Sequence, residues 1–214
     1  MIDVHTHVLN GFDDGAADKE TALALLKMAA ECGTTTLFCT PHVIEKAAKP
    51  AWPGIVQATR QLADEAHARG VDIQLLPGAE VELNWDLFDS IGSGGAYCLG
   101  DSGCVLLELP SQSIPAYADD FFYRLQLKGI MPILAHPERH EKLMRHPDLL
   151  LQWMHNDVLT QCNAGSFTGA FGEQVKKNAE LLLQHNMVCF IGSDAHKLEG
   201  RNTDLTAAAN CSRV

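Results

Sequence analysis

The sequence lacks paired cysteines, long apolar runs and an excess of basic residues. Its seven cysteines form no Cys-x-x-Cys pair, which excludes a zinc ribbon and a thioredoxin-like redox motif. None of them is followed six positions later by an arginine, so the phosphate-binding loop of a cysteine phosphatase is missing. No apolar run approaches the roughly 20 residues that span a bilayer.

The N-terminus also lacks the basic and apolar segments of a signal peptide, because the chain opens directly into Ile2-Asp3-Val4-His5. Together with the odd number of cysteines, this predicts a cytoplasmic protein that is not inserted in a membrane. The chain carries 27 acidic and 16 basic residues, a net charge of -11, which argues against nucleic acid as a partner. Ten histidines in an acidic chain instead favour a transition-metal site.

The 214 residues are 46% hydrophobic and 20% charged, the balance of an ordinary globular protein. Short apolar runs alternate with helix-patterned stretches, which predicts parallel strands connected by helices in one α/β domain. Either a doubly wound sheet or a (β/α) barrel fits this pattern. The predicted strands are 2–8, 35–40, 72–77, 104–109, 131–136, 158–163 and 188–192. The predicted helices are 18–32, 54–69, 115–128, 141–155 and 172–186, with loops at 44–53 and 92–103.

Every predicted strand ends in a histidine, a carboxylate or an asparagine. In parallel α/β folds these ends share one face, where active sites lie. Histidines two positions apart on a strand point to the same side, so His5 and His7 can bind one ion together. A buried Glu108 after three apolar residues needs a cation or hydrogen bonds to compensate it. The strand-end residues are His5, His7, His42, Glu80, Glu108, His136, Asn163, Asp194 and His196.

Taken singly, each of these residues is more often a helix cap or a hydrogen-bonded loop residue than a ligand. Their convergence at one face is what favours a metal site. Imidazoles and carboxylates without an obvious thiolate favour zinc, manganese or iron. The candidates exceed the four to six ligands of a single ion, which favours two or three ions that share a carboxylate and hydrolyse phosphate esters.

Six motifs in order resemble the PHP (polymerase and histidinol phosphatase) superfamily. The sequence is more closely similar to its bacterial metal-dependent protein-tyrosine phosphatases of capsular and exopolysaccharide biosynthesis. The motifs are H-x-H at 5–7, DDG at 13–15, T-P-H at 40–42, G-A-E at 78–80, H-P-E-R at 136–139 and S-D-A-H at 193–196. The resemblance implies a distorted (β/α)7 TIM-like barrel of the PHP type over residues 1–205, followed by a short C-terminal tail at 206–214.

The resemblance also implies two or three divalent ions, with manganese as the first expectation and iron or zinc as alternatives. Arg139 and Arg201 match family positions that hold phosphate, a role for which guanidinium geometry is suited. For Arg201, a solvated loop charge is an equal alternative. The implied ligands are His5, His7, Glu80 and Asp194 for one ion, Glu80, Glu108 and His136 for a second, and Asp14, His42 and His196 for a third.

The resulting hypothesis is a phosphomonoesterase that hydrolyses protein phosphotyrosine with a hydroxide held between two ions. By resemblance, its expected partner is a bacterial tyrosine kinase. Alternatives are a small-molecule phosphatase or phosphodiesterase, such as a histidinol phosphatase, and a non-catalytic binding domain. Relatives usually continue further past Asp194 and His196, so a short last helix or a truncated chain is expected. Asp13 is interpreted as a turn or supporting residue, and His140 as a helix-face residue. The oligomeric state is left open.

Overall fold

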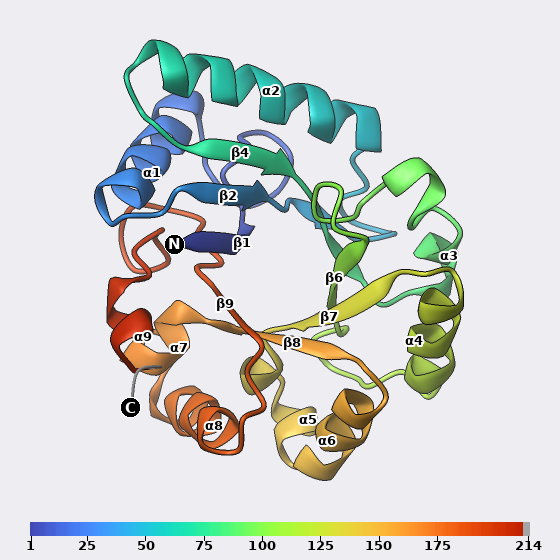
Figure 1. The fold of residues 1–214 in the computed structure, drawn as a ribbon. Coiled ribbons are helices and arrows are strands. Elements are labelled where there is room, and N and C mark those ends of the chain that lie inside the picture. The colour runs from blue at the N-terminus through green and yellow to red at the C-terminus, as the bar shows by residue number, and fades with distance from the viewer. Residues whose placement is uncertain (212–214) are drawn as a thin grey trace.

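The structure is a computed structural model that describes residues 1–211, in which a ring of strands is surrounded by helices (Figure 1). The strands are β1 Ile2–Thr6, β2 Thr36–Cys39, β3 His42–Val43, β4 Gln74–Pro77, β5 Glu80–Glu82, β6 Cys104–Glu108, β7 Met131–Ala135, β8 Leu159–Asn163 and β9 Phe190–Gly192. The helices are α1 Lys19–Glu31, α2 Trp52–Ala68, α3 Trp85–Phe88, α4 Ala118–Leu127, α5 Glu141–Met144, α6 Pro147–His155, α7 Ala164–Thr168, α8 Glu173–Gln184 and α9 Thr206–Cys211, with 3-10 turns η1 Ser93–Gly95 and η2 Pro137–Arg139.

The strands follow seven consecutive paths, as predicted, but two of these paths are interrupted. The parallel order is β1-β2-β4 in one sheet and β3-β5-β6-β7-β8-β9 in the other. The chain passes from β2 to β3 through Thr40-Pro41, and from β4 to β5 through Gly78-Ala79. A proline has no N–H for a ladder hydrogen bond, which explains the break at Pro41. The sequence patterns did not reveal β3 and β5 as separate strands.

Backbone hydrogen bonds join the two sheets into a distorted barrel. At one seam, Asp194 N donates to His5 O at 2.8 Å and His7 N donates to Ala195 O at 2.9 Å. At the other seam, Gly100 N donates to Pro77 O of β4 at 2.7 Å. The adjacent Leu99 N donates to the carbonyl of β6 residue 104 at 2.8 Å. The fold is therefore the (β/α)7 barrel rather than an open doubly wound sheet.

Apolar side chains fill one half of the barrel interior, which we call the apolar plug. Its buried members are Val4, Leu99, Leu106, Ile133 and Ala135. The pairing of β1 with β2 is irregular and contributes to this arrangement. Its register shifts between Asp3 and Thr6, as at a β-bulge. Bulges redirect side chains locally, and here one strand supplies both a plug residue and the site histidine that follows it.

A second apolar layer lies between the strands and the surrounding helices. α1 shows how the sequence builds it: the helix begins after Asp18, whose side chain accepts a hydrogen bond from Thr21 N at 2.8 Å and caps the first turn. Its apolar residues recur at helical spacing, and Leu25 and Leu26 are fully buried against the sheet.

Two local predictions differ from the structure. The predicted helix 141–155 is two helices, because Pro147 disfavours helical geometry at His146. α2 begins at Trp52, inside the predicted loop 44–53. Cys189 is exposed although it lies between the apolar residues Val188 and Phe190.

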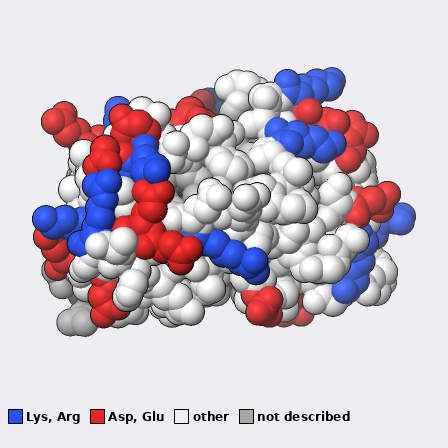
Figure 2. Space-filling view, turned by 90° about the horizontal axis from the view of Figure 1, so that it is seen from above, with Lys and Arg blue, Asp and Glu red and all other residues white. Residues whose placement is uncertain are grey.

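The outer surface carries charges of both signs. On the face seen in Figure 2, acidic and basic side chains lie interspersed around an uncharged centre. Pairs between α1 and the α2 region include Lys19–Glu65 at 2.7 Å and Arg69–Glu20 at 2.6 Å. Within residues 1–211, no helix has the length and apolar character needed to cross a membrane.

Candidate active site

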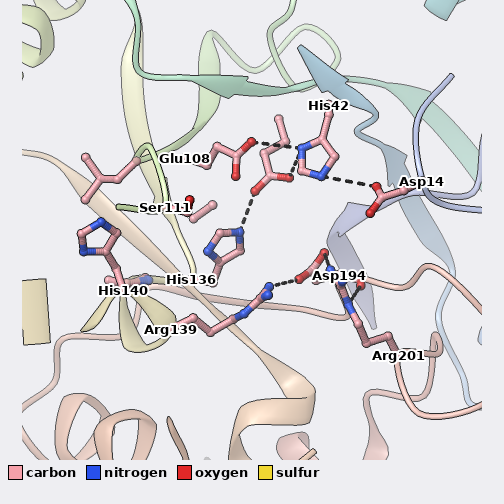
Figure 3. Close-up of a pocket in the computed structure, with 13 residues that line it drawn as sticks. Asp14, His42, Glu108, Ser111, His136, Arg139, His140, Asp194 and Arg201 are labelled. Carbon is pink, nitrogen blue, oxygen red and sulfur yellow. Dashed lines mark hydrogen bonds and ion pairs between the residues drawn. The ribbon is translucent and has the colours of Figure 1, made fainter. Parts of the chain in front are cut away.

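A cavity of about 280 Å³ opens at the C-terminal ends of the strands (Figure 3). The helices surround the barrel and do not cover this end of it, so side chains that directly follow the strands meet here. The structure brings together all residues that the sequence nominated. Those lining the cavity are Asp14, His42, Glu80, Glu108, His136, Arg139, Asp194 and Arg201. His5, His7 and His196 lie behind them in contact with this set.

The innermost group is formed by the two histidines of β1 and two carboxylates. The Nε2 atoms of His5 and His7 are 3.1 Å apart. Glu80 Oε2 lies 3.2 and 3.3 Å from these two nitrogens, and Asp194 Oδ1 lies 3.6 and 3.4 Å from them. All four side chains are almost fully buried. Four electron-rich atoms therefore surround one small volume.

Asp13 supports this group from outside. Its Oδ2 accepts hydrogen bonds from His7 Nδ1 at 2.7 Å and from His42 N at 2.9 Å. Its Oδ1 accepts one from Gly15 N at 2.9 Å. A Cβ at Gly15 would lie 2.1 Å from His7 O, which explains the glycine in the DDG turn. Because the carboxylate of Asp13 accepts, His7 must donate through Nδ1, which leaves Nε2 as the ring nitrogen that faces the site.

A second group lies across β3, β5 and β6. The register pairs His42 with Glu80 and aligns β5 with β6. His42 Nδ1 lies 3.0 Å from Glu80 Oε2 and 3.1 Å from Glu108 Oε1. From β7, His136 Nε2 donates to Glu80 Oε1 at 2.7 Å. Glu80 thus stands between the two groups and uses both of its oxygens.

A third group faces solvent. Asp14 Oδ1 lies 3.4 Å from His196 Nε2 and 3.7 Å from His42 Nε2. The side chain of Asp14 is 72% exposed, while His196 is buried and its ring lies 4.0 Å from that of His7, centroid to centroid. This carboxylate therefore sits at the rim of the cavity.

The most compact ligand sets overlap the expected assignment with three differences. His7 also groups with the solvent-facing residues, and His42 groups with Glu80 and Glu108 where His136 was expected. Asp194 is absent from the set that contains His5, His7 and Glu80. The three sets are His7, Asp14, His42 and His196; His5, His7 and Glu80; and His42, Glu80 and Glu108.

The electrostatics of the cluster reflect buried opposite charges. Burial disfavours a charged imidazole, but Glu80 and Asp194 outweigh it and raise the pKa of His5 to about 9. The same balance, with Glu108 and Glu80, raises the pKa of His42 to about 11. Although burial favours the neutral acid, neighbouring histidines hold the pKa of Glu80 well below its usual range. Glu80 therefore stays ionised, and a divalent cation bound here would displace the protons of the imidazoles that coordinate it.

Four buried atoms of the cluster lie within ion-pair distance of oppositely charged groups but make no hydrogen bond. Buried polar atoms normally have one, so each needs an explanation. Divalent cations bound by the compact ligand sets would satisfy all of them, since imidazole nitrogens and carboxylate oxygens are ordinary ligands of such ions. The atoms are His42 Nδ1, Glu80 Oε2, Glu108 Oε1 and His196 Nε2.

Two arginines close one side of the cavity. Arg139 Nη1 donates to Asp194 Oδ2 at 2.7 Å, and Arg201 Nη2 donates to Asp194 Oδ1 at 2.6 Å. Both guanidiniums also face the ring of Phe171, at 4.4 and 5.7 Å from its centroid. Arg201 is thus fixed at the site and is not a solvated loop charge. Asp194 and His136 have positive φ angles of 52° and 32°, and such conformations cluster at functional sites.

Sequence reasoning missed several residues around the cavity. His140 was interpreted as a helix-face residue, which is wrong: it is buried, lines the cavity and caps α5 by accepting from Leu143 N. Its Nε2 also lies 3.2 Å from Pro110 O. Phe171 belongs to no sequence motif. Only its contacts with Arg139 and Arg201 in the structure show that it is part of the site. Gln161 was part of a strand end but was not singled out.

Comparison with known proteins gives a consistent result. A family model described as "Capsular polysaccharide synthesis, CpsB/CapC" matches residues 1–213. The chain is 33% identical over 202 residues to the tyrosine-protein phosphatase YwqE of Bacillus subtilis, which covers 94% of this chain and 80% of YwqE. It is 26% identical over 206 residues to the tyrosine-protein phosphatase CpsB of Streptococcus pneumoniae, covering 94% of this chain and 85% of CpsB.

Solved structures agree with these sequence matches. A structure from work on YwqE of Bacillus subtilis and CpsB of Streptococcus pneumoniae, described as unique metal-dependent tyrosine phosphatases, superposes with a TM-score of 0.92 at 32% identity. The match covers 97% of this chain and 84% of that chain. A Listeria monocytogenes protein, hisK, provisionally assigned as a histidinol phosphatase, shares the fold with a TM-score of 0.56 at 17% identity, covering 94% and 97% of the two chains. The similarity to bacterial tyrosine phosphatases of capsular polysaccharide synthesis is thereby confirmed, and the chain belongs to the CpsB/CapC family.

Proposed function

We propose that this protein is a metal-dependent phosphatase that hydrolyses phosphotyrosine on proteins. The proposal rests on one observation. Imidazole and carboxylate atoms that make no hydrogen bond converge at one cavity, and two arginines lie beside them. Relatives that share 26% to 33% of their residues with this chain are named tyrosine-protein phosphatases. The chain is accordingly an enzyme of the hydrolase class.

The donor set suits two or three divalent ions. The inner ion would be held by His5, His7, Glu80 and Asp194, whose atoms already face one another. Manganese is the metal we expect, with iron and zinc as alternatives, because the set contains nitrogen and oxygen but no sulfur. A second ion would use Glu80, Glu108 and His136, with His42 near enough to contribute, and a third would use Asp14, His42 and His196.

Bound divalent ions would lower the pKa of water and neutralise phosphoryl oxygens. The chain's own contribution is to place the substrate. Arg139 and Arg201 can each donate two parallel hydrogen bonds to phosphate oxygens. Both now donate to Asp194, so a phosphate at the cavity would take over donors that are already oriented there. Phe171 keeps the two guanidiniums on one side of the cavity.

The physiological substrate that we infer is a tyrosine-phosphorylated bacterial kinase. The family's link to capsular polysaccharide synthesis supports this inference. A small-molecule phosphatase such as a histidinol phosphatase has weaker support, because the 17%-identical hisK structure carries the fold alone. A non-catalytic binding domain would be expected to lack some of the ligand residues, and every expected residue is present. The cytoplasmic location stays a prediction.

The direct test is hydrolysis of p-nitrophenyl phosphate with and without EDTA, followed by addition of Mn²⁺. We expect EDTA to abolish the activity and Mn²⁺ to restore it. A comparison of kcat/KM for a phosphotyrosyl peptide and for histidinol phosphate then separates the two substrate classes. Higher kcat/KM for histidinol phosphate would contradict the tyrosine-phosphatase proposal. Unchanged activity in a His42→Ala, His196→Ala double variant would contradict a third ion.

A further inference from the structure

Two amide side chains of β8 lie inside the barrel beside the candidate metal site. Gln161 and Asn163 are fully buried and alternate with Thr160 and Cys162 along the strand. The proposed chemistry assigns no role to either amide. Strand β8 pairs with β7 and β9. Across the barrel, Gln161 also contacts His5 of β1.

The two amides form an unbroken series of hydrogen bonds between two candidate ligands. His5 Nδ1 is 2.9 Å from Gln161 Oε1. Gln161 Nε2 donates to Asn163 Oδ1 at 3.0 Å, and Asn163 Nδ2 donates to Asp194 Oδ2 at 2.6 Å. The series therefore connects β1 with the segment that follows β9. All three contacts are buried.

The direction of this series follows from its last member. An ionised carboxylate only accepts hydrogen bonds, so Asn163 must turn its NH₂ group toward Asp194 and its oxygen toward Gln161. Gln161 must then donate to Asn163 and turn its own oxygen toward His5. An oxygen at that position requires a hydrogen on His5 Nδ1. The imidazole is thereby left with Nε2 for a ligand.

We propose that Gln161 and Asn163 act as one amide relay that positions His5 and Asp194 for a divalent cation. The relay selects the Nδ1–H form of His5 and holds the second oxygen of Asp194 while the first faces the site. This inference deepens the proposed function and rests on it. Groups behind metal ligands that fix their orientation commonly matter for metal affinity.

Packing around the relay leaves it little freedom. A Cβ at Gly192 would lie 2.7 Å from His5 Cβ and 3.0 Å from Gln161 Nε2. Asn163 is further held through its backbone N–H, which donates to Glu138 Oε1 at 2.9 Å. The same oxygen accepts from Ser166 at 2.7 Å, so the buried Glu138 anchors the end of β8. The amides are therefore held rigidly next to the site.

The test measures Mn²⁺ binding by equilibrium dialysis in the full chain. Gln161→Met keeps the volume but removes both polar atoms, and we expect Mn²⁺ to bind about 10- to 100-fold more weakly. Asn163→Leu should have a similar effect. Because the amides act as a unit, the double variant should lose no more than the larger single loss. Thr160→Val is the matched control, since Thr160 donates to Met187 O at 2.6 Å on the same strand.

The control should bind Mn²⁺ within about threefold of the unaltered protein, since the hydrogen bonds of the Thr160 hydroxyl go to Met187 and Cys189, away from the site, and their loss affects mainly stability. Equal Mn²⁺ affinity in the Gln161→Met variant and the unaltered protein would overturn the relay and leave the proposed function standing. Failure of the unaltered protein to bind Mn²⁺ would overturn both. Losses that multiply in the double variant would also contradict a single unit.

A second measurement needs no variant. In the unaltered protein loaded with diamagnetic Zn²⁺, long-range ¹H–¹⁵N correlation spectra report which nitrogen of each imidazole carries hydrogen. The relay predicts that His5 is protonated at Nδ1 and binds through Nε2. Binding through Nδ1 would overturn the proposal even if the Gln161 variants fail to fold.

Discussion

The two halves of the barrel interior differ sharply although the same strands build them. On β6, Leu106 lies in the apolar plug and Glu108 lies at the cavity. On β7, Ile133 lies in the plug and His136 follows the strand into the cavity. The plug buries apolar surface, which stabilises the fold. The residues around the cavity, which we call the polar end, instead include buried charges and buried polar atoms that make no hydrogen bond.

Each strand therefore contributes to stability through its residues in the plug and to activity through the residues at its C-terminal end. The polar end is costly without a cation, because buried charges lose their hydration. A substitution in the polar end should therefore change metal binding and activity more than stability, and a substitution in the plug should do the reverse.

Glu80→Gln should have the largest effect on activity. Glu80 contacts both inner histidines and His136, and the loss of its charge should lower kcat/KM by about 10³-fold, in line with several kcal/mol of transition-state stabilisation. Saturating Mn²⁺ should raise the melting temperature of the unaltered protein more than that of this variant. Glu65→Gln on the surface of α2 is the control. Full activity of the Glu80→Gln variant would contradict a role for Glu80 in metal binding.

Leu106→Ala should have the largest effect on stability. Leu106 is fully buried in the plug, and its truncation should cost about 2 to 5 kcal/mol of unfolding free energy. Urea denaturation measures this loss, and Leu127→Ala, at a site that is 69% exposed, serves as the control. The folded variant should keep its kcat/KM within a few fold. A loss of activity comparable to that of Glu80→Gln would contradict the division between the two halves.

Phe171→Leu should have a moderate effect on substrate binding. Its ring faces the guanidiniums of Arg139 and Arg201, a contact worth about 1 kcal/mol, or roughly fivefold. We expect this loss mainly in KM and in inhibition by inorganic phosphate. Phe171→Trp keeps an aromatic face and should behave like the unaltered protein. Equal KM values for the Leu and Trp variants would show that the ring does not position the arginines.

Alkylation of thiols should have no effect on activity. Burial raises the pKa of Cys39 to about 12, so its reactive thiolate is scarce at neutral pH. Burial also raises the pKa of Cys162. Among the cysteines whose exposure the structure describes, Cys189 is the exposed one and should react with iodoacetamide before the others, as mass spectrometry would show. Loss of activity on modification of Cys189 would point to a thiol mechanism.

Much of the fold was predictable because burial leaves a clear pattern. Seven apolar runs correspond to the seven strand paths, and the polar residues that follow them lie together at one end. The interruptions at Pro41 and Gly78 were not predicted, because each leaves only a two- or three-residue strand beyond it. Such short strands carry too few residues for a recognisable alternation.

Residues that act through other residues were harder to predict. Asp13 was recognised as a candidate support because it adjoins Asp14 in the DDG turn. Gln161 and Phe171 had no such neighbour, and their roles depend on contacts across the barrel with His5 and Arg139. Sequence spacing does not encode contacts between strands this far apart. The three compact ligand sets likewise depend on side-chain geometry, which is why His7 and His42 are shared differently from the expectation.

The central claim is that the polar end binds divalent cations. The most direct measurement is the metal content of the full chain purified without chelator, determined by inductively coupled plasma mass spectrometry and repeated after Mn²⁺ loading. The account predicts two or three ions per chain, with fewer in the Glu80→Gln variant. Less than one ion per chain after loading, in protein that hydrolyses p-nitrophenyl phosphate, would contradict it.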